Sequence, residues 1–264
     1  MLNIVTATTF MRKMKNGKTT PLLVRCELDN GEEIEVVAKL SGNCERRETA
    51  LAVESICAML AADLDLPVPE PFIVRLDPEI VDQDSYPDIY RFVASSCPLA
   101  FGSKLLPNGY ALTMRLLDPL LPMAAEIFTF DAMALNSDRR IDNPNCQSNG
   151  KSLAIFDHEM CLITDYLGTV MQQYPWVTGS LEHMKNGQSK HIFFDELSQK
   201  LQNLDDFGKK LAYIQKGRYR EYIQALPVEW VANQNTIQQI EAYLNQVSAN
   251  WSLLRLEVER VWNA

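Results

Sequence analysis

Three polar side chains near the middle of the chain have the types and the spacing that phosphoryl transfer requires. Asp138 and Asn143 stand five residues apart in the segment 136–143, and Asp157 follows a short apolar run. In this chemistry an aspartate positions the attacking hydroxyl, an asparagine five residues later binds magnesium, and a second aspartate binds magnesium after the next strand. We therefore predict that Asp138 is catalytic and that Asn143 and Asp157 are metal ligands.

Two apolar elements are predicted to hold these side chains. Residues 127–135 read as a buried helix that leads into the loop, and residues 152–156 form a short strand that ends before Asp157. His158 is interpreted as a packing or hydrogen-bonding residue rather than as a general base. The other two histidines, at positions 183 and 191, lack the HxxxH spacing and the carboxylate pattern of a zinc site.

A lysine and a glutamate in the amino-terminal part complete the pattern. Residues 32–40 alternate as a strand, which places Lys39 on the face opposite the apolar side chains. A helix is predicted over residues 46–63, and Glu54 is the one charged residue in its long apolar run. A carboxylate buried there without a cation would be strongly unfavourable. We therefore expect Glu54 to pair with Lys39 and to hold it on the α- and β-phosphates of ATP.

The segment 12–21 is basic and lies between two strand-like runs. It contains the pair Asn16-Gly17, which is a strong hairpin-turn signal. Two interpretations stay open: a solvated hairpin tip that carries lysines, or a loop that covers nucleotide phosphates with backbone N–H groups and basic side chains. The position of the segment ahead of Lys39 and Glu54 favours the second interpretation. The residues expected to contact the nucleotide there are Lys13, Lys15, Gly17 and Lys18.

Strand and helix signals divide the chain into two parts. The strands expected in the first part are residues 3–9, 22–28, 32–40, 72–76 and 88–94, and the helices expected in the second part are 193–203, 206–226, 228–245 and 246–262. The expected fold class is α+β and bilobal. Residues 1–100 would form an antiparallel sheet with one helix, and residues 101–264 a mostly helical part with the catalytic and metal-binding loops. Residues 101–110 are expected near the junction.

Composition narrows the class of protein. Apolar residues make up 47% of the chain and charged residues 22%, as in ordinary globular domains. The net charge of −9 disfavours a protein that coats nucleic acid, because phosphate contacts need a basic surface. We expect no membrane span and no signal peptide, and hence a cytoplasmic location. The six cysteines include no CxxC pair and are interpreted as reduced packing residues.

These residues resemble the HipA-like kinases, which have a protein-kinase-like fold shared with the phosphoinositide kinases. The resemblance extends from the loop at Gly17 to the segment 226–230. Its most specific parts are the NxDxHxxN-like segment 136–143 with the Pro-Asn pair after it, the triplet 157–159 (DHE), and the segment 66–71 (LPVPEP). The chain is shorter than the toxin-type members and resembles a short, single-chain group.

The resemblance implies a role for each of the residues singled out. Asp138 would be catalytic, Asn143 and Asp157 would bind Mg²⁺, and Lys39 with its partner Glu54 would anchor the ATP phosphates. Arg140 stands where the family usually has a histidine. As a catalytic residue, this arginine is expected to stabilise the charge on the transferring phosphoryl group.

The hypothesis from the sequence is therefore an ATP- and Mg²⁺-dependent kinase that phosphorylates serine or threonine in a protein substrate. Two alternatives stay open: a catalytically weak, kinase-like nucleotide-binding or scaffold module, and a kinase that acts on small molecules. The first is disfavoured because the sequence contains all five residues that the reaction needs, and a degenerate binder would be expected to have lost at least one. These residues are Lys39, Glu54, Asp138, Asn143 and Asp157. The acidic composition gives no support to an acidic small substrate.

Overall fold

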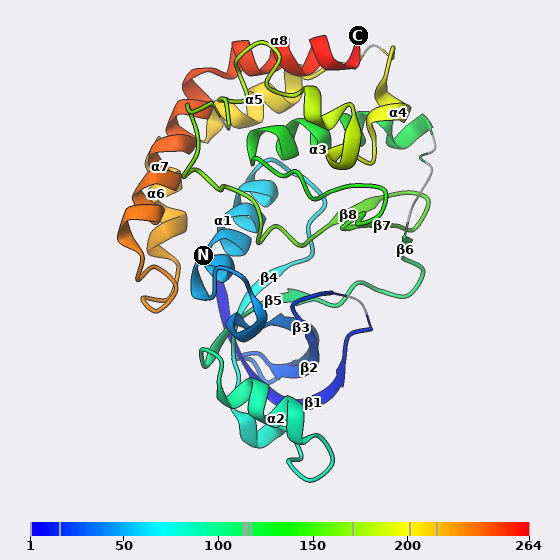
Figure 1. Cartoon of the computed structure of the whole chain (residues 1–264). Helices are drawn as coiled ribbons and strands as arrows, with labels where there is room; N and C mark the ends of the chain where they lie inside the picture. Colours follow the sequence, from blue (N-terminus) through cyan, green and yellow to red (C-terminus); the bar gives the residue numbers. More distant parts are fainter. Residues whose placement is uncertain are drawn as a thin grey trace. The chain divides into compact units, whose positions relative to one another are not determined.

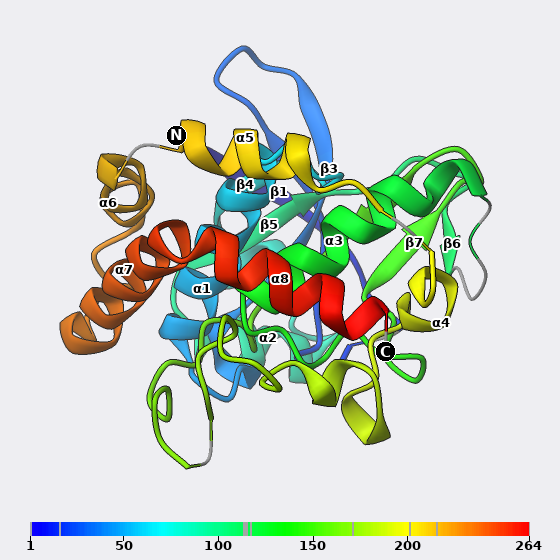
Figure 2. The same ribbon diagram turned by 90° about the horizontal axis from the view of Figure 1, so that it is seen from above.

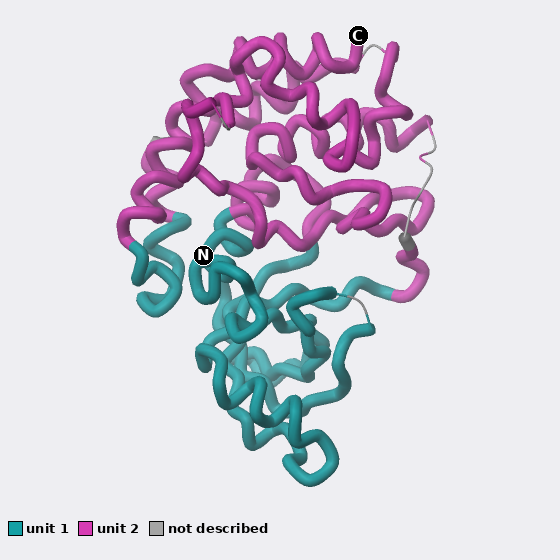
Figure 3. Tube along the Cα trace, viewed as in Figure 1, with its two compact units in different colours: residues 1–56, 69–107, 222–233 teal, residues 57–68, 108–221, 234–264 magenta. Residues whose placement is uncertain are grey.

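The chain forms two compact units in this computed structural model, and each unit combines segments that are distant in the sequence (Figure 3). Unit 1 consists of Met1–Ile56, Pro69–Pro107 and Tyr222–Asn233, and unit 2 of Cys57–Val68, Asn108–Glu221 and Gln234–Ala264. The structure describes residues 2–15, 17–112, 116, 118–170, 172–200, 202–214 and 216–263. The fold is α+β, as predicted, but the units are not divided at residue 100.

Five strands of unit 1 form a closed barrel (Figure 1). In barrel order they are β1 (Asn3–Lys13), β2 (Leu22–Glu27), β3 (Glu33–Lys39), β5 (Leu99–Lys104) and β4 (Pro71–Arg75). All neighbouring pairs are antiparallel except β1 and β4, which run parallel. The expectation of an antiparallel sheet was therefore wrong at this pair. A helical connection between β3 and β4 allows the parallel pairing, because such a connection can return the chain in the same direction.

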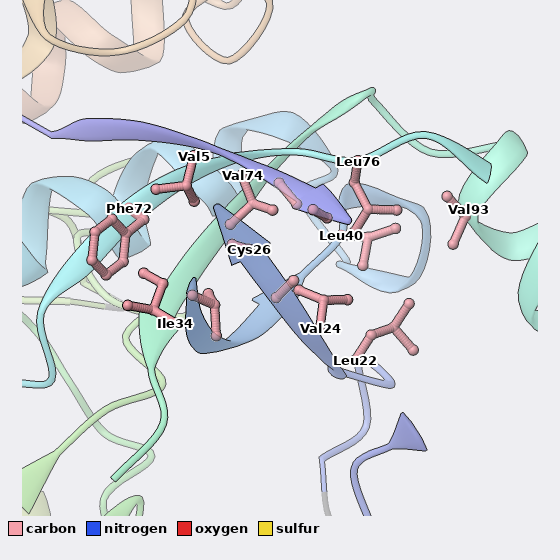
Figure 4. Close-up of a cluster of buried hydrophobic side chains, with 14 of the residues drawn as sticks. Val5, Leu22, Val24, Cys26, Ile34, Leu40, Phe72, Val74, Leu76 and Val93 are labelled. Carbon is pink, nitrogen blue, oxygen red and sulfur yellow. The ribbon is translucent and has the colours of Figure 1, made fainter. Parts of the chain in front are cut away.

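The apolar side chains of these strands fill the barrel (Figure 4). Strand β3 follows the predicted alternation, with Ile34, Val36 and Ala38 buried in this core. Gly102 of β5 lies between two neighbouring strands, where a Cβ atom would come within 2.6 Å of Val36 and 2.5 Å of Val74. The glycine therefore allows the strands to approach closely enough to close the barrel.

Helix α1 (Glu48–Asp63) is buried on all its faces between residues 50 and 61. It begins two residues later than the sequence predicted and ends where predicted. At its end, Asp65 has a left-handed φ of +55° and the Leu66 N–H donates to the Ala61 carbonyl at 2.9 Å. This is a Schellman-type end, which satisfies carbonyls of the last turn. The proline-rich segment that follows leads into β4.

The segment 88–94, predicted as a strand, is helical. It forms α2 (Pro87–Ala94), so the expectation of a single helix among the first hundred residues was wrong. Pro87 occupies the first turn, where a missing N–H costs nothing. Ile89, Phe92 and Val93 share one helical face and pack on the barrel core, and this burial selects the helix. The fifth strand of the barrel is β5, which lies just beyond this segment.

Unit 2 combines a small sheet with helices. The sheet is antiparallel, in the order β6 (Ala111–Leu112), β7 (Cys146–Ser148) and β8 (Leu153–Ile155). Helix α3 (Leu121–Met133) is almost entirely buried and lies beside α8 (Trp251–Trp262) (Figure 2). At this contact the rings of Phe128 and Trp262 lie 5.5 Å apart. The other helices are α4 (Phe194–Leu197), α5 (Asp205–Tyr213), α6 (Lys216–Gln224, part of which belongs to unit 1) and α7 (Gln234–Ala249).

The carboxyl-terminal half is helical as predicted, but several bounds were wrong. Residues 206–226 contain two helices, α5 and α6, rather than one. Among the described residues of the predicted helix 193–203, only α4 is helical. The predicted helix 228–245 begins at Gln234 and extends to Ala249. Before it, the fully buried Trp230 donates from Nε1 to the Leu99 carbonyl at 3.3 Å, so this segment is held by a side chain rather than by helical bonds.

The helical spacing of the apolar residues in the last two helices predicts a stripe that closes the core. Its seven residues are Leu244, Val247, Trp251, Leu254, Val258, Val261 and Trp262, and all of them except Trp251 are buried. The connections contain short 3₁₀ helices at Ser41–Asn43, Pro78–Ile80, Asp118–Leu120, Glu182–Met184 and Gly187–Ser189. Across the described residues, every helix is too short or too polar to cross a membrane.

Candidate active site

The predicted pair of Lys39 and Glu54 forms in unit 1. The Lys39 Nζ lies 2.7 Å from the Glu54 Oε2, and both side chains are buried. Lys39 is the last residue of β3 and Glu54 lies in the buried part of α1. The ion pair expected from a single charge inside an apolar helix is therefore confirmed. An ammonium group fixed in this way is suited to meet a phosphate.

The basic loop joins β1 to β2. Lys13 ends β1, and Lys15, Gly17 and Lys18 are exposed, while Asn16 of the predicted turn lies outside the described residues. A hydrogen bond from the Met14 N–H to the Pro21 carbonyl (2.8 Å) closes the loop. Gly17 has a φ of +111°, which a glycine adopts readily. The geometry is that of a hairpin tip with exposed ammonium groups, and it fits both interpretations of this segment.

Residues 136–145, which we call the catalytic loop, bring Asp138 and Asn143 of unit 2 together. The Asn143 Nδ2 donates to the Asp138 Oδ2 at 2.7 Å. A carboxylate only accepts hydrogen bonds, so the amide nitrogen of Asn143 must face it and the amide oxygen is the atom presented to a cation. The Arg140 Nη2 lies 3.5 Å from the Asp138 Oδ1, and its Nε lies 3.2 Å from the Asp142 Oδ1.

Asp157 lies at the end of the hairpin formed by β7 and β8. Cys146 pairs with Ile155 in this hairpin, and the Phe156 N–H donates to the Asn145 carbonyl at 3.2 Å. Asn143 comes shortly before β7 and Asp157 comes shortly after β8, so both residues lie at the same end of the hairpin. Asp157 has a φ of +65° and Asn145 a φ of +44°, in the left-handed region that non-glycine residues rarely adopt. Such conformations occur often where a backbone positions functional groups.

The oxygen atoms near this hairpin end fit a hard divalent cation. The amide oxygen of Asn143 and the carboxylate of Asp157 are oxygen donors of the kind that Mg²⁺ prefers. Glu159 adds a carboxylate oxygen within 4.8 Å of one on Asp157. Glu159 was not among the predicted ligands, because the spacing pattern of the sequence contains only Asp138, Asn143 and Asp157.

A buried polar network underlies the catalytic loop, and its main members were missed. Asp131 of α3 is fully buried, and its Oδ2 accepts from the Arg139 Nε at 2.6 Å and from the His191 Nε2 at 2.9 Å. Its Oδ1 accepts from the Asn136 Nδ2 at 2.7 Å. A signal for this network existed, because Asp131 is the one charged residue in the apolar run 127–135, as Glu54 is in the apolar run 50–62.

Burial and neighbouring charges shift the pKa values of this network in opposite directions. Burial alone would raise the pKa of Asp131, but the Arg139 charge and the hydrogen bond with His191 outweigh it and hold that pKa far below its usual range. Burial lowers the pKa of His191, although Asp131 opposes the shift. The network thus contains one ionised carboxylate, one guanidinium and a neutral imidazole. His158 is also buried and contacts Arg139, as the hydrogen-bonding interpretation predicted.

The comparisons of family and fold define a class of protein, the kinase-like phosphotransferases. A family model described as HipA-like kinase matches residues 7–264, and the chain therefore belongs to the HipA-like kinase family. Membership implies ATP and a divalent metal ion in general. A sequence comparison with curated proteins gives no match.

One solved structure similar to this chain is the crystal structure of a Helicobacter pylori proinflammatory kinase, CtkA. The two share 14% sequence identity with a TM-score of 0.53, and the match covers 99% of this chain and 98% of the other. At this identity the similarity establishes the kinase fold and nothing about the substrate.

Proposed function

We propose that this chain is an ATP- and Mg²⁺-dependent kinase that phosphorylates serine or threonine in a protein substrate. The observation that carries the proposal is the 2.7 Å hydrogen bond between Asn143 and Asp138, in a loop that continues into the hairpin ending at Asp157. Phosphoryl transfer by the kinase fold uses these three groups in this order. In this proposal, units 1 and 2 correspond to the small and large lobes of the kinase fold.

In unit 1, Lys39 binds the α- and β-phosphates and Glu54 holds its ammonium group in place. The buried position of this pair excludes water from the contact, which strengthens the attraction to a phosphate oxygen. The basic loop contributes exposed cations and backbone N–H groups to the same nucleotide. The residues proposed to do so are Lys13, Lys15, Gly17 and Lys18.

In unit 2, Asp138 orients the acceptor hydroxyl and accepts its proton. Asn143 holds the Asp138 carboxylate through its amide nitrogen and presents its amide oxygen to Mg²⁺, which Asp157 also binds. The metal ion, when bound, neutralises charge on the phosphate oxygens. Arg140 lies next to the Asp138 carboxylate, where a guanidinium can stabilise charge that develops on the transferring group.

The same contact between Arg140 and Asp138 favours one competing function, a kinase-like module that binds nucleotide without efficient transfer. An arginine that pairs with the catalytic aspartate competes with the acceptor hydroxyl for that carboxylate. Thermal stability measured with ATP, with and without Mg²⁺, separates the candidates. Stabilisation by ATP without transfer would support the module, and no stabilisation in either condition would contradict both functions.

The decisive test is transfer of labelled phosphate from ATP into proteins of a cell lysate. We expect wild-type chain to label serine or threonine, and Asp138→Asn to lower the rate by about 10²–10⁴-fold, the usual contribution of a positioned base. Asp206→Asn is the matched control, because Asp206 is an exposed aspartate on α5 of the same unit. Equal labelling by wild type and Asp138→Asn would refute the assignment of Asp138. Labelled lipid or sugar with unlabelled protein would identify a small-molecule kinase instead.

A further inference from the structure

Arg139 has no part in the reaction described above, yet its side chain touches three separate elements of unit 2. We propose that Arg139 is a positioning residue that fixes the catalytic loop to the hairpin carrying Asp157, with Asp131 as the buried anchor. The inference rests on the proposed function, since it concerns the placement of Asp138 relative to the metal ligands.

The guanidinium contacts connect these elements directly. The Nε and Nη2 atoms donate to the two carboxylate oxygens of Asp131 at 2.6 and 3.2 Å. The Nη1 donates to the Asn145 carbonyl, and the Nη2 lies 3.1 Å from the His158 Nε2. The backbone of Arg139 is held as well, because its carbonyl accepts from the Ile192 N–H at 3.1 Å. One side chain thus joins α3, the catalytic loop and the segment after β8.

Each contact lies next to a residue with a proposed role. Arg139 follows Asp138 in the chain and His158 follows Asp157. The Asn145 carbonyl, two residues after Asn143, also accepts from the Phe156 N–H at 3.2 Å. A shift of the guanidinium would therefore move the backbone on both sides of the metal ligands.

A second path leads from Asp131 to Asp138. The Asn136 Nδ2 donates to the Asp131 Oδ1 at 2.7 Å, and the Asn136 Oδ1 accepts from the Asp138 N–H at 3.0 Å. Asp131 therefore holds the catalytic loop on both sides of Asp138, through Asn136 before it and through Arg139 after it. This arrangement fixes the loop against α3, which is itself buried.

The chemistry of arginine explains why this residue type is required. Its planar group offers five donors in a fixed fork, whereas lysine offers a single point charge. Arg139 is 1% exposed and cannot exchange a lost partner for water. Replacing a buried ion pair by apolar residues is often neutral or stabilising, so the pair is poorly explained by stability alone. Fixing the geometry of the loop is a function that apolar side chains would not perform.

The contacts also determine the proton positions of two histidines. Arginine only donates, so the His158 Nε2 must accept and, in the neutral ring, the proton is on Nδ1. The His191 Nδ1 accepts from the Phe193 N–H at 3.1 Å, so its Nε2 carries the proton that Asp131 accepts. These assignments give a readout that does not depend on activity. The chain has only three histidines, which makes their signals simple to assign.

The first experiment compares Arg139→Lys with Tyr243→Phe in the full chain. Tyr243 also makes a buried hydrogen bond to α3, from its Oη to the Met133 carbonyl at 2.7 Å, and this bond joins α7 to α3 rather than to the catalytic loop. We expect Arg139→Lys to lower kcat, or to raise the Mg²⁺ concentration for half-maximal rate, by about 10–100-fold, as for other groups that orient metal ligands. The KM for ATP is expected to change far less. Tyr243→Phe should keep the wild-type kcat at a similar loss of thermal stability.

If Arg139→Lys does not fold, His191→Gln replaces it, because glutamine keeps a neutral donor toward Asp131. A smaller decrease in kcat of the same kind is then expected. Wild-type values of kcat and Mg²⁺ dependence in the variant used would overturn the inference and leave the proposed function intact.

The second experiment records long-range ¹H–¹⁵N spectra of the histidine rings without nucleotide or metal. We expect the Nδ1–H tautomer for His158 and the Nε2–H tautomer for His191 in the wild type. Arg139→Lys should shift the His158 ring signals, and Tyr243→Phe should leave them unchanged. An unshifted His158 signal in Arg139→Lys would contradict the network. If His191→Gln is used instead, an unshifted His158 signal in that variant would contradict it in the same way. This result holds even if the wild type transfers no phosphate, which would refute the proposed function alone.

Discussion

Two buried cation–carboxylate pairs organise the residues assigned to catalysis. Lys39 pairs with Glu54 in unit 1, and Arg139 pairs with Asp131 in unit 2. In each pair the carboxylate is the one charged group of an apolar helical segment, where burial without a cationic partner would be strongly unfavourable. The two cations differ in type. The lysine offers a compact charge to phosphates, whereas the arginine divides its donors among several protein groups.

The proposed role of Glu54 gives a prediction at the residue scale. Glu54→Gln keeps the size of the side chain and removes the charge that holds the Lys39 Nζ at 2.7 Å. We expect the affinity for an ATP analogue, measured by calorimetry, to fall by at least about tenfold, equivalent to ~1.4 kcal/mol. Glu48→Gln is the control, because Glu48 lies on the same helix and accepts from Ser41 instead. Equal affinity in the two variants would remove Glu54 from the nucleotide site.

At the scale of elements, burial rather than local propensity decided which segments became strands. Segment 87–94 has apolar residues at helical spacing and packs as α2, whereas β5 is a strand despite a glycine in its middle. The glycine is required by the neighbours, since Gly102 lies where the side chains of Val36 and Val74 meet. The barrel therefore depends on one residue without a side chain.

The tight packing at Gly102 predicts the effect of one added methyl group. Gly102→Ala would place a Cβ 2.5 Å from the Val74 Cγ2 and 2.6 Å from the Val36 Cγ1, so these side chains or their strands must shift. We expect a loss of about 1–3 kcal/mol in the free energy of unfolding, measured by urea denaturation. Gly217→Ala is the matched control, because Gly217 lies in α6 with no atom within 4 Å of the added Cβ. That change should be neutral or stabilise by up to about 1 kcal/mol. Equal stabilities of the two variants would contradict the close approach.

At the scale of the whole molecule, neither unit is a continuous stretch of sequence. Unit 1 takes segments from both halves of the chain, including Tyr222–Asn233 with the buried Trp230. The stability of each unit thus depends on contacts between residues that are distant in the sequence. The pH dependence of that stability is set in part by titratable groups that such contacts bury. His191 is such a group, because Asp131 and Phe128 of α3, Arg139 of the catalytic loop and the neighbouring Phe193 surround it.

The lowered pKa of His191 predicts how global stability depends on pH. An unfolded histidine titrates near ~6.5. Because burial holds the folded pKa below that value, the unfolded chain binds the proton first, and stability is full above about pH 6.5 and falls as the pH decreases toward the folded pKa. The slope from this group approaches ~1.4 kcal/mol per pH unit. Asp131 stays ionised in this range because its pKa lies far lower.

The measurement is urea unfolding of the wild type and His191→Gln between about pH 7.5 and 5.5, a range that spans the ordinary histidine pKa. We expect the variant to show a flatter dependence than the wild type, because glutamine does not titrate. Parallel curves would show that His191 is not held neutral by the fold.

The sequence by itself determined the types and the order of the residues that we propose for phosphoryl transfer. A local pattern is enough to read the spacing of Asp138, Asn143 and Asp157. A local pattern also shows that Glu54 is an isolated charge in an apolar run, and such a charge needs a cationic partner when the run is buried. The same reasoning would have found Asp131. The α+β class and the core stripe of the last helices also follow from periodicity, because apolar faces must be buried.

Tertiary structure alone decided the closed barrel, the parallel pairing of β1 with β4 and the helical state of residues 87–94. It decided as well that Trp230, from the carboxyl-terminal half of the chain, bonds to Leu99 in unit 1. It also decided that Arg139 joins Asp131, Asn145 and His158. These features depend on contacts between residues far apart in the chain. A local pattern records which side chains need burial or a partner, but the partner itself is selected only when the segments pack together.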